Sequence, residues 1–161
     1  MFYCLDKYHR YEYCKIVTQL VNWCRGQPCD GRDEHYIVPY LKAVVLQLQE
    51  QPLLYKNARE IELADIQKAV MKALQPGEMK WAKIVTSIAL CVTMAQLHEQ
   101  KECQRIIDDF IYVLYCQTNE WLDSHNRWMG MMGYLNSDKS DLHRELITML
   151  GSLMFYNMYK C

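Results

Sequence analysis

The segment that most limits how this chain can fold is residues 81–97, where apolar residues occupy nearly every face of a helix. They are Ile84, Val85, Ile88, Ala89, Leu90, Val92, Met94 and Ala95. A helix that is apolar all round is stable in water only when other elements surround it. The sequence therefore predicts an all-α bundle built around a central hydrophobic helix.

Amphipathic helices are predicted on both sides of this segment, because apolar residues recur with helical spacing and strand patterns are scarce. They cover residues 13–26, 39–51, 65–74, 102–116, 119–124 and 127–135, with a last helix from residue 141. Residues 53–63 are predicted to form a short helix or an irregular bridge. The short link after residue 97 predicts an antiparallel hairpin with the next helix. We expect about eight helices in one domain, residues 1–161.

Composition excludes some classes of partner. The chain has 161 residues, 51% of them hydrophobic, and a net charge of −1. This length fits one domain with a substantial core. A chain without excess positive charge has no general attraction for nucleic acid or an anionic membrane. We therefore expect no nucleic-acid partner and recognition by local shape.

The cysteines and the apolar segments indicate a reduced, anchor-free protein. There are eight cysteines but no Cys-x-x-Cys pair, and several lie within helical patterns, where free cysteine behaves as a small hydrophobe. The charged first ten residues are not typical of a signal peptide. The apolar stretches 84–97 and 146–159 are shorter than the roughly 20 residues of a membrane span. We expect a cytoplasmic protein without a transmembrane anchor.

No motif for catalysis, cofactor binding or metal binding is present. The five histidines form no His-Glu-x-x-His pattern, and there is no Walker loop or nucleophile elbow. Cys24, Cys29 and His35 are more typical of surface loop residues than of a zinc site. A Cys–His nucleophile pair stays open, because such pairs meet only in space. We expect no enzyme, no cofactor and no metal.

Two segments resemble the homology motifs of the Bcl-2 family of cell-death regulators. Lys80-Trp81-Ala82-Lys83-Ile84-Val85 is similar to the family's Asn-Trp-Gly-Arg-Ile-Val, which opens a long apolar helix. Residues 120–128 are similar to a second motif, in which a tryptophan is followed seven residues later by the tryptophan of Gly-Gly-Trp. Trp121 and Trp128 have that spacing, with Asn126 and Arg127 in the glycine positions. Residues 13–26 look like the family's N-terminal homology helix.

The resemblance implies a hydrophobic groove that holds an amphipathic death-ligand helix, whose apolar side chains enter at i, i+3 or i+4, and i+7. The second and fourth helices would wall this groove and the fifth would floor it. The candidate groove residues are Val45, Leu48, Ile66, Ala69, Val70, Leu74, Lys83, Val85, Thr86 and Leu90. Periodicity does not say which way a two-sided helix faces, so the protein core is the alternative place for each.

Lys83 stands where the family has an arginine that pairs with a ligand aspartate. Lysine keeps the charge but loses the bidentate geometry of the guanidinium. The resemblance therefore implies ligand binding with less geometric stringency or with fewer partners. A solvated charge in the first turn is the alternative for Lys83. Sub-micromolar binding of death-ligand peptides, abolished by Lys83→Glu, is the expected behaviour.

The pattern favours a pro-survival member over a killer. A member that serves as ligand needs Leu-x-x-x-Gly-Asp on its second helix, whereas Leu41 is followed here by Val45 and Leu46. A short first loop and the missing anchor resemble virus-encoded members. We therefore expect an inhibitor of apoptosis in the host cytoplasm that sequesters pro-apoptotic Bcl-2 family proteins and reaches mitochondria through them.

Other classes of function are compatible with the sequence. A Bcl-2-like viral protein can instead bind host signalling proteins through its outer faces, and a closed groove would favour that reading. A secreted helical bundle with disulfides and an enzyme of unknown type are the remaining classes. Self-association is a further expectation, because an empty groove exposes apolar surface. The last helix could close the core, lie on a membrane or sit in the groove.

Overall fold

The computed structural model describes residues 2–27 and 31–158, and the side chains of residues 7–27 and 31–153. Eight α-helices and one 3-10 helix make up this part of the chain, and it contains no strand. The elements are α1 (Phe2–Cys24), α2 (Val38–Gln49), α3 (Pro52–Glu60), η1 (Leu63–Asp65), α4 (Ile66–Leu74), α5 (Trp81–Leu97), α6 (Gln100–Ser124), α7 (Arg127–Leu135) and α8 (Lys139–Met158). The predicted all-α bundle is confirmed at this level.

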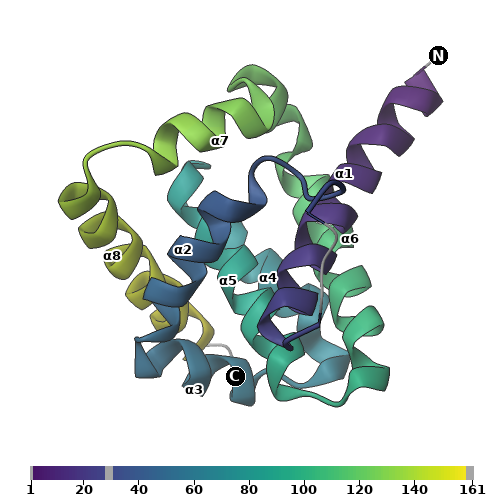
Figure 1. The fold of residues 1–161 in the computed structure, drawn as a ribbon. Helices are drawn as coiled ribbons and strands as arrows, with labels where there is room; N and C mark the ends of the chain where they lie inside the picture. Colours follow the sequence, from purple (N-terminus) through teal and green to yellow (C-terminus); the bar gives the residue numbers. More distant parts are fainter. Residues whose placement is uncertain (1, 28–30, 159–161) are drawn as a thin grey trace.

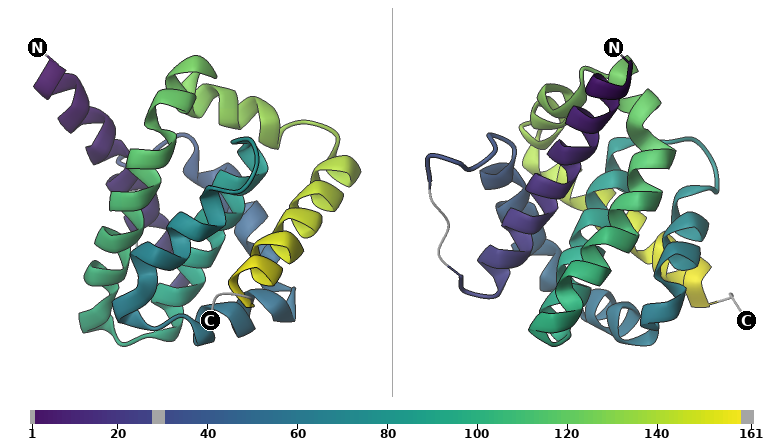
Figure 2. Two further views of the ribbon diagram at one scale, coloured as in Figure 1. Left: turned by 180° about the vertical axis from the view of Figure 1, so that it is seen from behind. Right: turned by 90° about the vertical axis from the view of Figure 1, so that its right-hand side faces the viewer.

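Helix α5 lies at the centre of the bundle. Every residue from Ala82 to Ala95 is buried, as predicted from its apolar circumference. It packs against α1, α2, α3, α4, α6 and α8, and Figures 1 and 2 show these helices on all sides of it. The link between α5 and α6 is only two residues long, so the two helices form the predicted hairpin.

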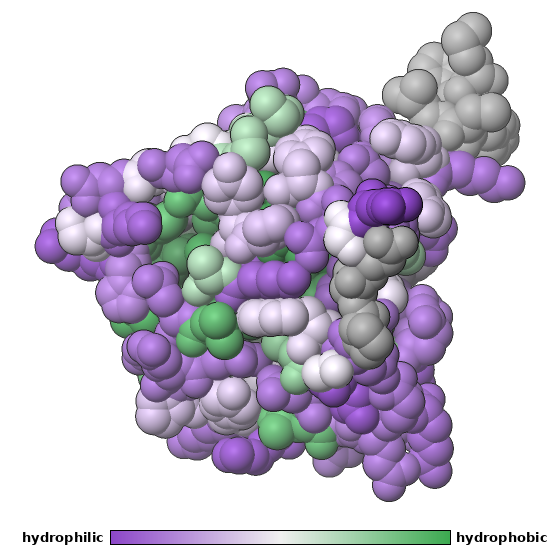
Figure 3. All heavy atoms as spheres, in the orientation of Figure 1, coloured by the Kyte–Doolittle hydropathy of each residue, from purple (hydrophilic) through white to green (hydrophobic). Residues whose placement is uncertain are grey.

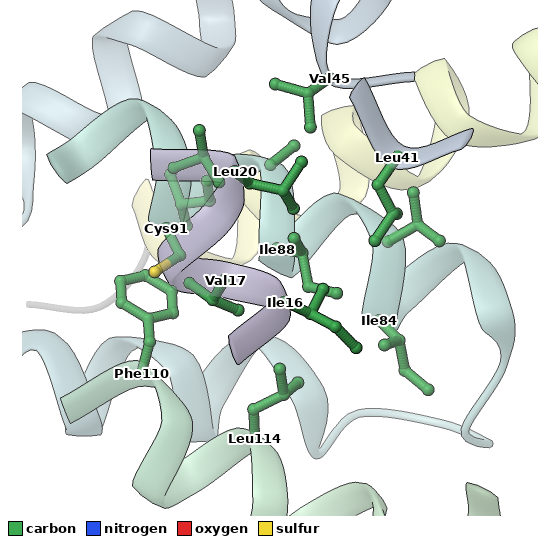
Figure 4. Packing of buried hydrophobic residues seen from close by; sticks show 14 of the residues in the cluster. Ile16, Val17, Leu20, Leu41, Val45, Ile84, Ile88, Cys91, Phe110 and Leu114 are labelled. Atoms are coloured by element: carbon green, nitrogen blue, oxygen red, sulfur yellow. The ribbon is translucent and has the colours of Figure 1, made fainter. Parts of the chain in front are cut away.

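The core joins elements that are far apart in the sequence. Ile16, Val17 and Leu20 of α1 meet Ile88 and Cys91 of α5, with Phe110 and Leu114 of α6 alongside (Figure 4). Leu41 and Val45 of α2 close this cluster from another side. Complete burial of such side chains stabilises a fold by about 1.5–3 kcal/mol each.

Glycine and proline set several helix ends, as their backbone preferences require. Gly26 has φ 74° and ends the turn after α1, and Gly77 has φ 72° in the link between α4 and α5. Positive φ is accessible to glycine at little cost. Pro39 and Pro52 lie in the first turns of α2 and α3, where proline leaves no intrahelical hydrogen bond unmade.

Some predicted boundaries were wrong. Helix α6 runs unbroken through Gln100–Ser124 instead of forming separate helices over 102–116 and 119–124. Its buried stripe continues through Thr118 and Leu122, and no glycine or proline interrupts it. Helix α1 begins at Phe2, well before residue 13. Residues 53–63, whose pattern allows a short helix or an irregular bridge, form most of α3 and a short extended link.

In the part of the chain that the structure describes, no helix is both long enough and apolar enough to cross a membrane.

Candidate helix-binding site

The C-terminal helix α8 lies across a surface made by α3, α4 and α5 (Figures 1 and 2). Four leucines on its inner face are buried: Leu142, Leu146, Leu150 and Leu153 are 6%, 1%, 2% and 4% exposed. Their spacing of i, i+4, i+8 and i+11 forms one stripe of a helix. The surface beneath α8 is referred to below as the trough. It accommodates an amphipathic helix, and the helix seated there belongs to the same chain.

Apolar contact accounts for nearly all of this attachment. The outer face of α8 is polar and exposed, at Asp141, His143, Arg144, Glu145 and Thr148 among others. Among the described side chains, one hydrogen bond joins α8 to another helix: the Tyr134 hydroxyl of α7 donates to Glu145 Oε1 over 3.0 Å. Burial and the Glu145 carboxylate both raise the pKa of Tyr134, so the phenol stays protonated as the donor.

Two hollows flank α8, one toward each end of the helix. The first has a volume of about 370 Å³ and lies beside the link between α4 and α5; it is lined by Ala73, Pro76, Gly77, Glu78, Lys80, Lys83, Met149, Ser152 and Leu153. The second has a volume of about 360 Å³ and lies between α2 and the corner of α7 and α8. Both hollows are open to solvent and are therefore surface recesses beside α8.

Lys83 lines the first hollow, but its ammonium is engaged within the protein. Its side chain is 5% exposed, and Nζ donates to the carbonyl oxygen of Leu74 at 3.4 Å and to that of Pro76. These carbonyls lie at the C-terminal end of α4, where a cation complements the helix dipole. Burial lowers the pKa of Lys83, and nearby Lys80 lowers it further. The charge expected to receive a ligand aspartate is thus engaged within the fold.

All ten candidate groove residues are buried, each at most 5% exposed. These residues are Val45, Leu48, Ile66, Ala69, Val70, Leu74, Lys83, Val85, Thr86 and Leu90. Val45 belongs to the core cluster beside α1 and α5 (Figure 4). The Thr86 hydroxyl donates to the Ala82 carbonyl oxygen over 2.7 Å, within its own helix. An external helix could reach the trough only after α8 has moved.

The motif tryptophan Trp81 fixes the start of α5 to the corner between α6 and α7. Its ring meets that of Trp121 edge-on at 4.7 Å between centroids, and Trp121 stacks on His125 at 3.8 Å. Gly130 makes this approach feasible, since a Cβ there would lie 1.9 Å from the His125 carbonyl oxygen and 2.9 Å from the Trp81 ring. Ala82 is completely buried next to it. These motif residues have a structural role.

Trp128 belongs to a second aromatic cluster. It is 2% exposed and meets Tyr13 of α1 edge-on at 5.2 Å and His35 at 6.2 Å. Tyr13 is hydrogen-bonded to Thr118 of α6 over 2.8 Å. Sequence reasoning missed the contacts of Tyr13 and His35 with Trp128, because nothing in a helical pattern identifies a contact between residues so far apart in the chain.

The two residues before Trp128 have the backbone conformation of glycine. Asn126 has φ 63° and Arg127 has φ 47°, values that are uncommon for residues other than glycine. Arg127 is held by α6, because its guanidinium donates to Asp123 Oδ1 at 2.6 Å and to Asn119 Oδ1 at 3.0 Å. These are the positions where the motif of the resembled family carries Gly-Gly.

Cys24 and His35, whose pattern is more typical of loop residues than of metal ligands, belong to no cluster of metal-binding side chains within the described residues. No group of three or more His, Cys, Asp or Glu side chains there could hold an ion. Both nitrogens of His35 are engaged, with Glu12 Oε2 at 2.9 Å and with the Ile37 backbone N–H at 3.2 Å. Cys29 lies outside the described residues. Cys14, Cys24, Cys91, Cys103 and Cys116 are free thiols.

Comparison of this chain with protein-family models, curated proteins and solved structures gives no match. The assignment of a function therefore depends on the geometry of the trough and on the two motif resemblances.

Proposed function

We propose that this chain is a pro-survival regulator of the Bcl-2 type, which binds the amphipathic helix of pro-apoptotic proteins in the trough and thereby restrains cell death. Helix α8 occupies the trough in the absence of a ligand. The observation that carries the proposal is the burial of the four α8 leucines against α3, α4 and α5. A surface that accommodates one leucine-striped helix has the width and apolar character that a second needs.

The energetics of exchange are compatible with this function. Each buried leucine contributes about 1.5–3 kcal/mol, so α8 is held firmly by four of them. An incoming helix with the same spacing of leucines would restore these contacts. The net free energy of exchange is then the difference between the binding free energies of the two helices, which are similar. The apparent affinity equals the affinity of the open trough multiplied by the fraction of molecules in which α8 has left it.

Backbone geometry at the second motif supports the family part of the proposal. Positive φ at Asn126 and Arg127 explains why a related chain would carry glycine there. The buried, central position of α5 supports the expectation that the first motif opens a long apolar helix. Virus origin and a cytoplasmic host-cell location remain part of the same proposal.

A second candidate function is binding of host signalling proteins through the outer faces. It is favoured by the burial of all ten groove candidates and by the engagement of Lys83 with α4. Tyr8, Tyr11 and Tyr112 are 60%, 61% and 50% exposed on α1 and α6. Tyrosine is enriched at the energetic centres of protein interfaces. The original reason to expect a homodimer, an empty apolar groove, does not apply while α8 covers it.

Titration with labelled death-ligand peptides separates the two candidates. Fluorescence anisotropy is measured for the wild type, for Leu150→Glu, which weakens the seating of α8, and for the control Thr148→Glu, which adds the same charge on the exposed face. We expect binding to the wild type and about tenfold tighter binding to Leu150→Glu, because more molecules have an open trough. Thr148→Glu should match the wild type. Absence of binding to all three proteins would leave the outer-face function.

A further inference from the structure

The second hollow has a lining suited to an apolar side chain. On one side, α2 presents Pro39, Tyr40, Ala43, Val44 and Gln47, and on the other lie Leu135, Asn136, Lys139 and Leu142 from the α7–α8 corner. Figure 3 shows apolar atoms recessed between α8 and α2. Its volume of about 360 Å³ is at the lower end of the ~300–1,000 Å³ of ligand pockets.

The α2 side of the hollow has the pattern of a helix contact. Its lining residues follow one another at i, i+1, i+4, i+5 and i+8, which places them on one face. Ala43 and Gln47 are exposed, while Val44 is 5% exposed and forms the floor. A partner helix lying along α2 would cover this face.

Lys139 is the one charged side chain in the lining, and it has no partner among the described residues. It is exposed in the first turn of α8, where a cation is unfavourable to the helix dipole. Two carboxylates near Lys139 in the sequence have hydrogen-bond partners of their own, while Asp141 lies exposed in the same first turn. Asp138 accepts from the Ser140 N–H and hydroxyl at 3.0 and 2.8 Å, and Glu145 accepts from Tyr134. An external carboxylate beside Lys139 would therefore gain an available cation.

We propose that this α2–α8 hollow is a docking site for an acidic amphipathic helix, which inserts an apolar side chain beside Ala43 and pairs a carboxylate with Lys139. The identity of this partner rests on the proposed function, since the same kind of helix would then reach the trough. Docking here requires no movement of α8. While α8 covers the trough, Lys139 is the cation that pairs with the ligand's carboxylate, because the ammonium of Lys83 is bonded to the Leu74 and Pro76 carbonyl oxygens.

The test uses the full chain and a labelled synthetic helix peptide with leucines at i, i+4 and i+7 and one aspartate. Ala43→Trp fills the hollow from an exposed position, and Ala64→Trp, exposed but outside the lining, is its control. We expect Ala43→Trp to weaken binding roughly tenfold and Ala64→Trp to leave it unchanged. Stopped-flow mixing should place most of the loss in the first, concentration-dependent phase.

Charge reversal tests the ion pair. Lys139→Glu should weaken binding about threefold to tenfold, and a peptide with lysine for aspartate should recover it. Lys68→Glu, which reverses an exposed charge on α4, is the control. Retained binding in both Ala43→Trp and Lys139→Glu would overturn the docking site and leave the trough function intact. Absence of peptide binding to the wild type would overturn both. A wild-type dimer in sedimentation that Ala43→Trp dissociates would assign the hollow to a second copy and contradict the proposal.

Discussion

The ammonium of Lys83 lies 3.4 Å from the carbonyl oxygen of Leu74, so the first residue expected to meet a ligand instead closes the C-terminal end of α4. Lys83 and Leu74 both belong to the predicted groove set, one as its charge and the other as its wall. Their contact joins the end of α4 to the start of α5 inside the protein. This relationship changes what substitutions at Lys83 can report.

Lys83→Glu is expected to destabilise the fold by at least about 3 kcal/mol, because it buries a negative charge against carbonyl oxygens. Lys83→Met should change the free energy of unfolding by no more than about 1 kcal/mol. Loss of the hydrogen bonds destabilises this variant, whereas removal of the desolvation cost of the buried ammonium stabilises it, so the two effects oppose each other. Urea denaturation of both variants measures the difference. Equal stability of Lys83→Glu and the wild type would show that the side chain points to solvent.

Gly130→Ala should reduce the free energy of unfolding by about 1–3 kcal/mol. The added Cβ would collide with the His125 carbonyl and press on the Trp81 ring. Gly133→Ala, in the same helix with nothing within 4 Å of the added atom, should stabilise by about 0.5–1 kcal/mol. Thermal melts followed by circular dichroism compare the pair. Similar effects at the two glycines would rule out the close approach of α5 to α7.

Asn126→Gly should leave stability unchanged or raise it slightly, whereas Asn126→Ala should lower it by about 1 kcal/mol. The reason is φ 63° at this residue, a conformation that disfavours a Cβ but that glycine adopts freely. Asparagine tolerates it better than alanine does. Chemical denaturation of the two variants tests this. A more stable Asn126→Ala would place residue 126 inside an ordinary helix.

Stability should fall between pH 10 and pH 12, partly because of Tyr13. Burial raises the pKa of Tyr13 from its usual 10.0 to about 12, and the hydrogen bond with Thr118 only partly opposes this. The unfolded phenol loses its proton near pH 10 while the folded one keeps it, so the unfolded state is favoured as the pH rises. The decline attributable to Tyr13 is about 2–3 kcal/mol.

Tyr13→Phe removes this part of the decline and also the hydrogen bond with Thr118. It should be less stable than the wild type below pH 10 and more stable above pH 12. Tyr112→Phe, at a half-exposed tyrosine, is the matched control and should follow the wild type. Parallel curves for Tyr13→Phe and the wild type across this range would contradict the burial of Tyr13.

The central helix could be predicted from the sequence because its whole circumference is apolar, and α4 and α7 could be located by periodicity and by glycine and proline at their ends. The length of α6 could not, since the shorter stripes before and after Cys116 are equally compatible with one helix or two. Thr118 decides in favour of one, because a polar residue that looks like a helix end is instead buried and bonded to Tyr13.

The site was harder to predict than the fold. A helical stripe such as Leu146, Leu150 and Leu153 shows that a helix has an apolar face, but not which surface that face covers. The same limit applied to Lys83, whose partner is fixed by the turn at Gly77 between α4 and α5. Nothing in the sequence marks Lys139 as a binding residue, because the hollow that it lines depends on how α2 and α8 are placed in space.

The claim that α8 is a displaceable occupant of the trough is tested most directly by hydrogen–deuterium exchange of the wild-type chain with and without a death-ligand peptide. The account predicts that the peptide protects amides of α3, α4 and the first half of α5 while exchange in residues 139–158 becomes faster. The proposed displacement would be contradicted if a bound peptide left α8 as protected as before, or if protection fell only on the outer faces of α1 and α6.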